Sequence, residues 1–133
     1  MADVHAFACR LRSSEHETIV NNLSAGAAKY RFLLDVRDPW PDTKYTDIRV
    51  RKIGPAHTSE QFLRNAKYRG MPHIRCGDRV RVGEEEGAIV GHNGSANFDV
   101  LFTSGKWAGQ TLNVHPSEVM LLDAAPIDIG VRE

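Results

Sequence analysis

Apolar and polar residues alternate in short runs, separated by turn residues, across residues 76–122. Alternation places successive side chains on opposite faces of a strand, so this pattern predicts an antiparallel sheet with one buried face. The side chains expected to point inward include Val80, Ile89, Val100 and Phe102. Five strands are expected, at residues 78–82, 88–90, 98–102, 111–114 and 119–122.

Turn residues mark the corners between these strands. The acidic loop 84–86 is flanked by glycines, which adopt the positive φ that a tight reversal requires. Asn93-Gly94 is a favourable pair for a hairpin turn. Residues 116–118 predict a single 3₁₀ turn, because their leading proline starts such a turn well and cannot donate to a sheet ladder.

The first part of the chain predicts a strand followed by a long helix. Residues 4–12 alternate as a half-buried strand does. Ser14 and Glu17 have the spacing of a helix N-terminal capping box. Apolar residues then recur at helical spacing as far as Val36, and the prolines within 38–42 end the helix.

A second strand and a short helix are expected next. Residues 44–52 alternate between apolar and charged side chains. Residues 60–68 then have the apolar spacing of a short helix, with Thr58 or Ser59 as its N-cap and Gly70 just beyond its C-terminus.

The expected fold class is α+β. An N-terminal strand-helix-strand-helix lobe over 1–72 is expected to pack on a five-stranded barrel over 73–124, followed by a flexible tail over 125–133.

Four runs within the barrel region resemble a known fold family. They are Gly-Asp-Arg-Val-Arg-Val at 77–82, Glu-Gly-Ala-Ile-Val at 86–90, Phe-Asp-Val-Leu-Phe at 98–102 and His-Pro-Ser-Glu-Val at 115–119. Together they resemble the SH3-like barrel in its KOW and Tudor-like variants, over roughly a third of the chain. The resemblance implies a small closed barrel whose relatives bind nucleic acid, modified or proline-rich peptides, or the surfaces of ribosomes and polymerases. In general character, the whole chain also resembles uncharacterised small bacteriophage and prophage proteins, which often bind one host protein.

Composition narrows the class of protein. The 133 residues have no net charge and 41% hydrophobic content, which is enough for a globular interior. No apolar run approaches the ~20 residues of a membrane span, and the first residues have no secretory-signal pattern. With only two cysteines and no disulfide framework, a reducing cytoplasm is the expected compartment.

Charge is unevenly distributed along the chain. Residues 1–82 hold 15 Lys and Arg against 9 Asp and Glu, and residues 83–133 hold 2 against 8. The asymmetry fits a basic binding lobe beside an acidic barrel, or two lobes that attract each other.

No set of residues has the spacing of a catalytic or metal site. His73 and Cys76 form half of a zinc pair without a second half, and the six histidines are scattered. Cys9 lies on the apolar side of its strand, which favours a core position over a nucleophile. The chain is therefore expected to be a non-enzyme without metal or cofactor.

Basic and aromatic residues are the better candidates for a site, because arginine forks suit phosphate oxygens and aromatic rings stack on bases. The candidate residues are Arg10, Arg12, Arg49, Arg51, Lys52, Arg64, Lys67, Tyr68, Arg69 and Trp107. The alternative is that these cations form a solvated face and ion pairs with the acidic half. The leading hypothesis is a binding module that contacts nucleic acid or a nucleic-acid-bound machine. The alternative function is a phage-type adaptor or inhibitor that binds a host protein.

Overall fold

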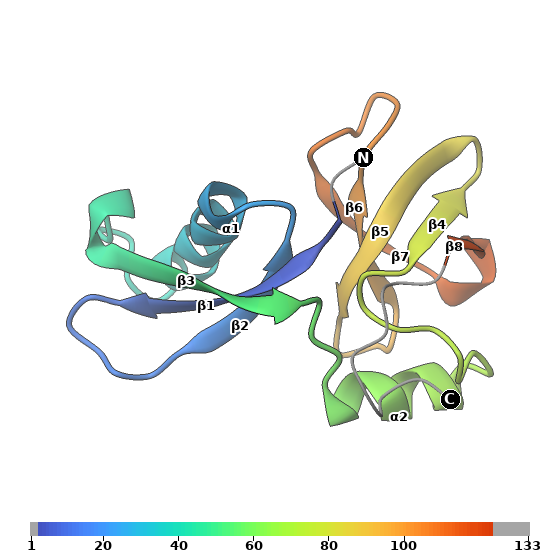
Figure 1. The fold of residues 1–133 in the computed structure, drawn as a ribbon, viewed down its shortest axis with the longest axis horizontal. Helices are drawn as coiled ribbons and strands as arrows, with labels where there is room; N and C mark the ends of the chain where they lie inside the picture. The colour runs from blue at the N-terminus through green and yellow to red at the C-terminus, as the bar shows by residue number, and fades with distance from the viewer. Residues whose placement is uncertain (1–2, 124–133) are drawn as a thin grey trace. The chain divides into compact units, whose positions relative to one another are not determined.

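The computed structural model describes residues 3–123, which form two helices and two sheets of the α+β class (Figure 1). Its contacts divide the chain into two compact units, Met1–Pro55 and Ala56–Glu133, named here unit 1 and unit 2. The tail expected over 125–133 lies outside the described residues. No helix within 3–123 combines the length and apolar character needed to cross a membrane.

Unit 1 contains a three-stranded antiparallel sheet in the order β2-β1-β3 (Figure 1). Its strands are β1 at His5–Leu11, β2 at Thr18–Asn22 and β3 at Ile48–Pro55. The helix α1 at Ala25–Arg37 connects β2 to a short 3₁₀ helix, η1 at Tyr45–Asp47, which leads into β3. The expected strands at 4–12 and 44–52 are thus present with shifted bounds.

The long helix expected from Ser14 to Val36 is wrong in its first part. Thr18–Asn22 is a strand that pairs with β1, with Ile19 opposite Ala8. Three β-branched residues in a row favour this extended structure, and the ladder with β1 satisfies their backbone groups. The helix begins after Ser24, whose hydroxyl accepts a hydrogen bond from the Ala27 amide at 3.1 Å.

The core of unit 1 lies between the sheet and α1. Phe7 and Cys9 of β1 and Ile48 of β3 contact the buried side of α1. That side of the helix contributes Ala28, Phe32, Leu33 and Val36. Because β1 is the central strand and its side chains alternate from Phe7 onward, one of its faces lies under α1 and the other is left uncovered by the helix.

The first helix of unit 2 is α2 at Glu60–Tyr68, with the bounds expected for the short helix. The hydroxyl of Ser59 accepts a hydrogen bond from the Phe62 amide at 3.0 Å, which identifies Ser59 as the N-cap. Thr58 has a different role, because its hydroxyl accepts from the Cys76 amide. Gly70 has a φ of 75°, the left-handed conformation expected just beyond the helix end.

The five strands expected in the second half are all present. They are β4 at Arg79–Val82, β5 at Glu85–His92, β6 at Phe98–Phe102, β7 at Thr111–Val114 and β8 at Val119–Asp123. The expected 3₁₀ turn is η2 at Pro116–Glu118. Within the described residues the sheet has the order β7-β6-β5-β4-β8 and is not closed into a barrel. The expected closure is therefore wrong, because alternation identifies the buried face of each strand but not which edges pair.

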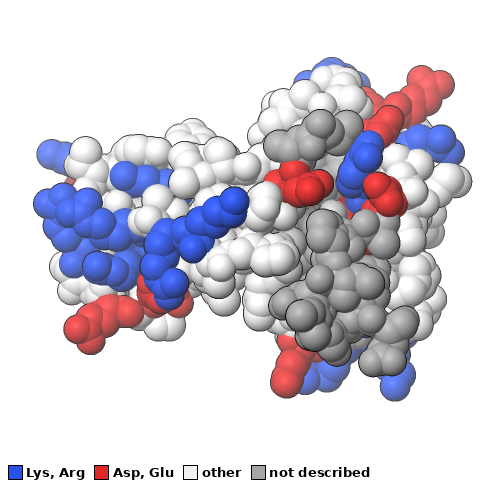
Figure 2. All heavy atoms as spheres, in the orientation of Figure 1, with Lys and Arg blue, Asp and Glu red and all other residues white. Residues whose placement is uncertain are grey.

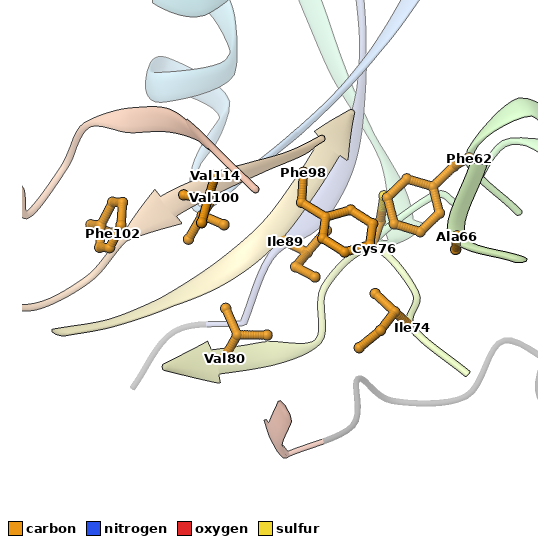
Figure 3. Close-up of a cluster of buried hydrophobic side chains, with 10 residues drawn as sticks. All are labelled: Phe62, Ala66, Ile74, Cys76, Val80, Ile89, Phe98, Val100, Phe102 and Val114. Atoms are coloured by element: carbon orange, nitrogen blue, oxygen red, sulfur yellow. The ribbon is translucent and has the colours of Figure 1, made fainter. Parts of the chain in front are cut away.

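The core of unit 2 joins α2 to this sheet (Figure 3). Val80, Ile89, Val100 and Phe102 are buried, as the alternation predicted. Phe62 of α2 is 1% exposed, and its ring lies 5.6 Å from that of Phe98, centroid to centroid. Ala66, on the same side of α2, belongs to the same cluster. This packing explains why α2 groups with unit 2, whereas the sequence placed it in a first lobe ending at residue 72.

The position of the α1 N-cap gives a test of the fold of unit 1. Ser24→Ala removes the hydroxyl that caps the helix and should lower the free energy of unfolding by about 1 kcal/mol. Ser14→Ala, at the cap expected from the sequence, should change it by less than about 0.5 kcal/mol, because the Ser14 hydroxyl caps no helix and accepts only an exposed hydrogen bond from the His16 amide. Urea denaturation followed by circular dichroism measures both values. A larger loss for Ser14→Ala would contradict the position of the helix.

Two aromatic residues of α2 give a matched test of the core of unit 2. Phe62→Ala empties a buried position and should destabilise the chain by about 3–5 kcal/mol. Tyr68→Ala should cost less than about 0.5 kcal/mol, because the Tyr68 side chain is exposed. Equal losses in urea denaturation would show that Phe62 is not part of the core.

Candidate functional site

Arginines line the face of the unit 1 sheet that α1 does not cover. In β1, Phe7 and Cys9 lie in the core, so Arg10 lies on the opposite face. The register pairs Arg10 with Arg49 and Ala8 with Arg51, which places both β3 arginines on that face as well. We call Arg10, Arg49 and Arg51, with Arg12 just beyond the end of β1, the arginine face. Figure 2 shows Lys and Arg side chains gathered on the side of unit 1 turned toward the viewer.

Arg10 is held by backbone carbonyls. Its Nη1 donates to the carbonyl oxygens of Leu11 at 3.2 Å, Arg12 at 3.4 Å and Ser14 at 3.1 Å. These bonds tie the guanidinium to the loop between β1 and β2. Because carbonyls are neutral, Arg10 is held in place while its full positive charge remains.

Arg51 is paired with an acid. Its Nε and Nη2 donate to the two carboxylate oxygens of Glu17 at 3.1 and 2.9 Å, a bidentate fork. These hydrogen bonds lower the pKa of the Glu17 carboxyl, and the charges of Arg51 and Arg10 act in the same direction. The carboxylate therefore stays ionised at neutral pH and offsets one of the positive charges.

Arg49 has no such counterion. It lies directly opposite Arg10, and within residues 3–123 no salt bridge joins Arg49 or Arg12 to a carboxylate. Like charges directly opposite each other across a ladder repel. The Arg10–Arg49 pair is therefore an unbalanced positive centre on the surface of unit 1. Lys52 is separate from it, because it pairs with Phe7 and so lies on the other face.

Three adjacent hollows are lined in part by residues of the arginine face. The smallest, of about 170 Å³, is lined by Arg10, Glu17, Arg49 and Arg51. The second, of about 500 Å³, shares Arg10 and Glu17 with the first. The largest, of about 900 Å³, shares Arg12, Ser13 and Ser14 with the second and reaches Trp40.

Trp40 was not among the candidate residues expected from the sequence. It was expected only to belong to the proline-rich segment that ends the helix. The sequence feature that could have identified Trp40 is a large aromatic side chain with a proline on each side. The prolines keep Trp40 out of a helix or strand, so its side chain is a poor candidate for burial. Trp40 is 62% exposed and lines the largest of the three hollows.

The other candidate residues lie in unit 2 and have different environments. Arg69 donates from Nη2 to the Ser95 carbonyl at 2.8 Å and to Asn97 Oδ1 at 3.0 Å, so it fastens α2 to the loop 93–97. Arg64 donates to Gln61 on the same helix. Lys67 and Tyr68 are exposed. Of the two aromatic candidates, Tyr68 has the more exposed side chain, at 81% against 38% for Trp107.

Trp107 lies away from the strands, in the loop between β6 and β7. It is 38% exposed, and the amine of Lys106 lies 5.0 Å from its ring centroid. Within the described residues no hydrogen bond or ring contact joins Trp107 to α2. The structure thus does not bring Trp107 and the α2 cations into one cluster.

The charge asymmetry along the sequence does not coincide with the two units. Unit 1 carries nine Lys and Arg against seven Asp and Glu, and unit 2 carries eight against ten. The net charges of unit 1 and unit 2 are therefore +2 and −2, whereas residues 1–82 and 83–133 carry +6 and −6. The basic character of unit 1 is therefore local, on its arginine face.

Comparisons with known proteins add no assignment. No match was found among protein-family models, curated proteins or solved structures. The resemblance to SH3-like barrels and to small phage proteins therefore stays a prediction, and the site is interpreted from its geometry alone.

Titratable side chains in the described region are dispersed or engaged. No group of three or more His, Cys, Asp or Glu within 3–123 could hold a metal ion. His92 shares a hydrogen bond with Asn65 at 3.0 Å, and His115 with Ser117 at 2.8 Å. Cys9 is fully buried, and burial raises the pKa of its thiol to about 11.

The thiol of Cys9 should therefore be inert in the folded chain. With a pKa of about 11, on the order of one thiol in a thousand is ionised at pH 8, and the thiolate is the reactive form. Ellman's reagent at pH 8 should react slowly with the native chain and rapidly with two thiols after denaturation in urea, because Cys76 is buried too. Rapid release of one equivalent from native protein would instead identify a reactive cysteine.

Proposed function

We propose that unit 1 binds the phosphate backbone of nucleic acid through the arginine face. The observation that carries the proposal is the cross-strand Arg10–Arg49 pair, whose two arginines line one hollow, while no salt bridge within residues 3–123 joins Arg49 to a carboxylate. A phosphate placed between them would relieve their repulsion and accept charge-assisted hydrogen bonds from both.

The surroundings of the pair support an extended polyanion over a single small anion. Arg51 lies two residues farther along β3, and Arg12 lies two residues farther along the chain in the other direction. The four arginines line three adjacent hollows, so a ligand that carries several phosphates in a row could contact all four guanidinium groups. Ile19, exposed on β2 opposite Ala8, adds an apolar contact on the same face.

A protein partner is the second candidate function, and one feature of unit 2 favours it. Within the described residues β8 is an edge strand of its sheet, and three apolar residues in succession on it are exposed: Met120, Leu121 and Leu122. Exposed apolar edges are surfaces at which proteins pair or dock. An adaptor or inhibitor of a host protein would use this strand, and its binding would not depend on Arg49.

Binding to a labelled octamer of single-stranded DNA tests the nucleic-acid proposal. About four phosphate contacts predict a slope near −3 for log affinity against log salt, which is roughly a 50-fold loss between 50 and 200 mM. Arg49→Gln removes one contact and should reduce the slope by about 0.7. Fluorescence anisotropy over a salt series measures the slopes.

Two further variants sharpen the result. Arg31→Gln makes the same change on α1, where Arg31 pairs with Asp35, and should leave the slope unchanged. Glu17→Gln should strengthen binding, because it frees Arg51 and removes a negative charge from the face. Absence of binding at 50 mM salt would overturn the proposal, as would an equal loss for Arg31→Gln and Arg49→Gln.

A further inference from the structure

Trp40 is displayed on a fixed backbone. Its amide donates to the Val36 carbonyl at 2.9 Å, which continues the hydrogen bonding of α1. Its carbonyl accepts from the Thr43 amide at 3.2 Å and from the Thr43 hydroxyl at 2.8 Å. Prolines precede and follow it, and each fixes its own φ. The exposed indole is therefore held by a loop with little freedom, which lowers the entropy lost when a ligand binds to it.

The hollow beside Trp40 is lined by both apolar and polar groups. Trp40, Pro41 and Leu11 supply apolar surface, while Arg12, Ser13 and Ser14 supply a cation and hydroxyls. The carboxylates of Asp42 and Asp47 also line it. Because these acids repel a phosphate, an uncharged, flat group suits the hollow beside Trp40 better than a phosphate does.

Shared lining residues connect this hollow to the rest of the arginine face. Arg12, Ser13 and Ser14 line both the hollow at Trp40 and the next one, which in turn shares Arg10 with the hollow at Arg49. A ligand that extends from Trp40 past Arg12 and Arg10 would therefore present one flat group followed by several anions.

We propose that the hollow at Trp40 accepts an unpaired base of a single-stranded nucleic acid, stacked on the indole, while the adjoining phosphates lie along Arg12, Arg10 and Arg49. This inference rests on the proposed function and adds the class of ligand to it. An unpaired base has a free face for stacking, whereas the bases of a duplex are already stacked on each other. Single strands are thus selected over duplexes.

An oligonucleotide without bases is the matched ligand for the test. An octamer of thymidylate and an abasic octamer carry the same phosphates, so only the bases distinguish them. One stacked base should make wild-type binding of the thymidylate octamer about five- to 150-fold tighter, the range that corresponds to 1–3 kcal/mol. Trp40→Ala should lose this difference while keeping its affinity for the abasic octamer and its salt slope. Trp40→Phe should retain part of the affinity difference between the two octamers, and Trp107→Ala should retain all of that difference.

Fluorescence gives a second readout that does not depend on affinity alone. The chain has two tryptophans, so Trp107→Phe leaves Trp40 as its sole indole. The thymidylate octamer should quench the emission of this variant and the abasic octamer should not, because stacking brings a base against the ring.

The outcomes separate the two proposals. If Trp40→Ala keeps the preference for bases, the stacking inference is overturned and the arginine face can still bind phosphates. If neither octamer binds at 50 mM salt, the proposed function fails, and the inference fails with it. Equal binding of a duplex octamer and the single strand would also overturn the inference.

Discussion

The pairing of β1 with strands on both of its sides is the constraint on which the candidate site depends. β1 is the central strand of unit 1, and the burial of Phe7 and Cys9 under α1 assigns a face to every residue along it. A slip of one residue would bury Arg10 and expose both core residues. The register that buries the apolar side chains of β1 is therefore the same register that places Arg10 opposite Arg49.

The arginine face shows how a small sheet can hold an excess of positive charge without unfolding. Arg10 is held by three neutral carbonyls, so its position is fixed while its charge remains. Arg51 is balanced by Glu17, but the pair is exposed, and exposed ion pairs contribute little to stability. A phosphate could therefore replace the Glu17 carboxylate on Arg51 at small cost. The face thus combines an arginine held by neutral carbonyls with a second arginine in an exposed ion pair.

The sequence predicted an element well where its capping, apolar and turn residues all indicated the same structure. The helix α2 matched its expected bounds, because Ser59, Phe62 and Gly70 all indicate the same element. The segment at 18–22 was misassigned, because its apolar residues fit a helical period and only the contact with β1 decides in favour of a strand. Closure of the five-stranded sheet was likewise beyond the sequence, since edge pairing is set by contacts between strands distant along the chain.

The same limit applies to the candidate residues. Alternation along β1 and β3 places Arg10, Arg49 and Arg51 on one face once the register is known, because period two is a property of the strand itself. It could not show that Arg69 is bonded to a loop more than twenty-five residues away, a contact that makes this cation structural. Charge counts along the chain misled for a related reason, since they joined residues that belong to two different units.

Trp40 and the arginines contribute different properties to one surface. Guanidinium groups on strands attract any polyanion, and their contribution to affinity decreases with salt. An indole discriminates by shape, because it gains contact only from a flat group that can lie against it. The arginines alone would make unit 1 an indiscriminate binder of negative charge. If the proposed stacking holds, the loop that presents Trp40 near Arg12 would convert that general attraction into a preference for a ligand with both phosphates and exposed bases.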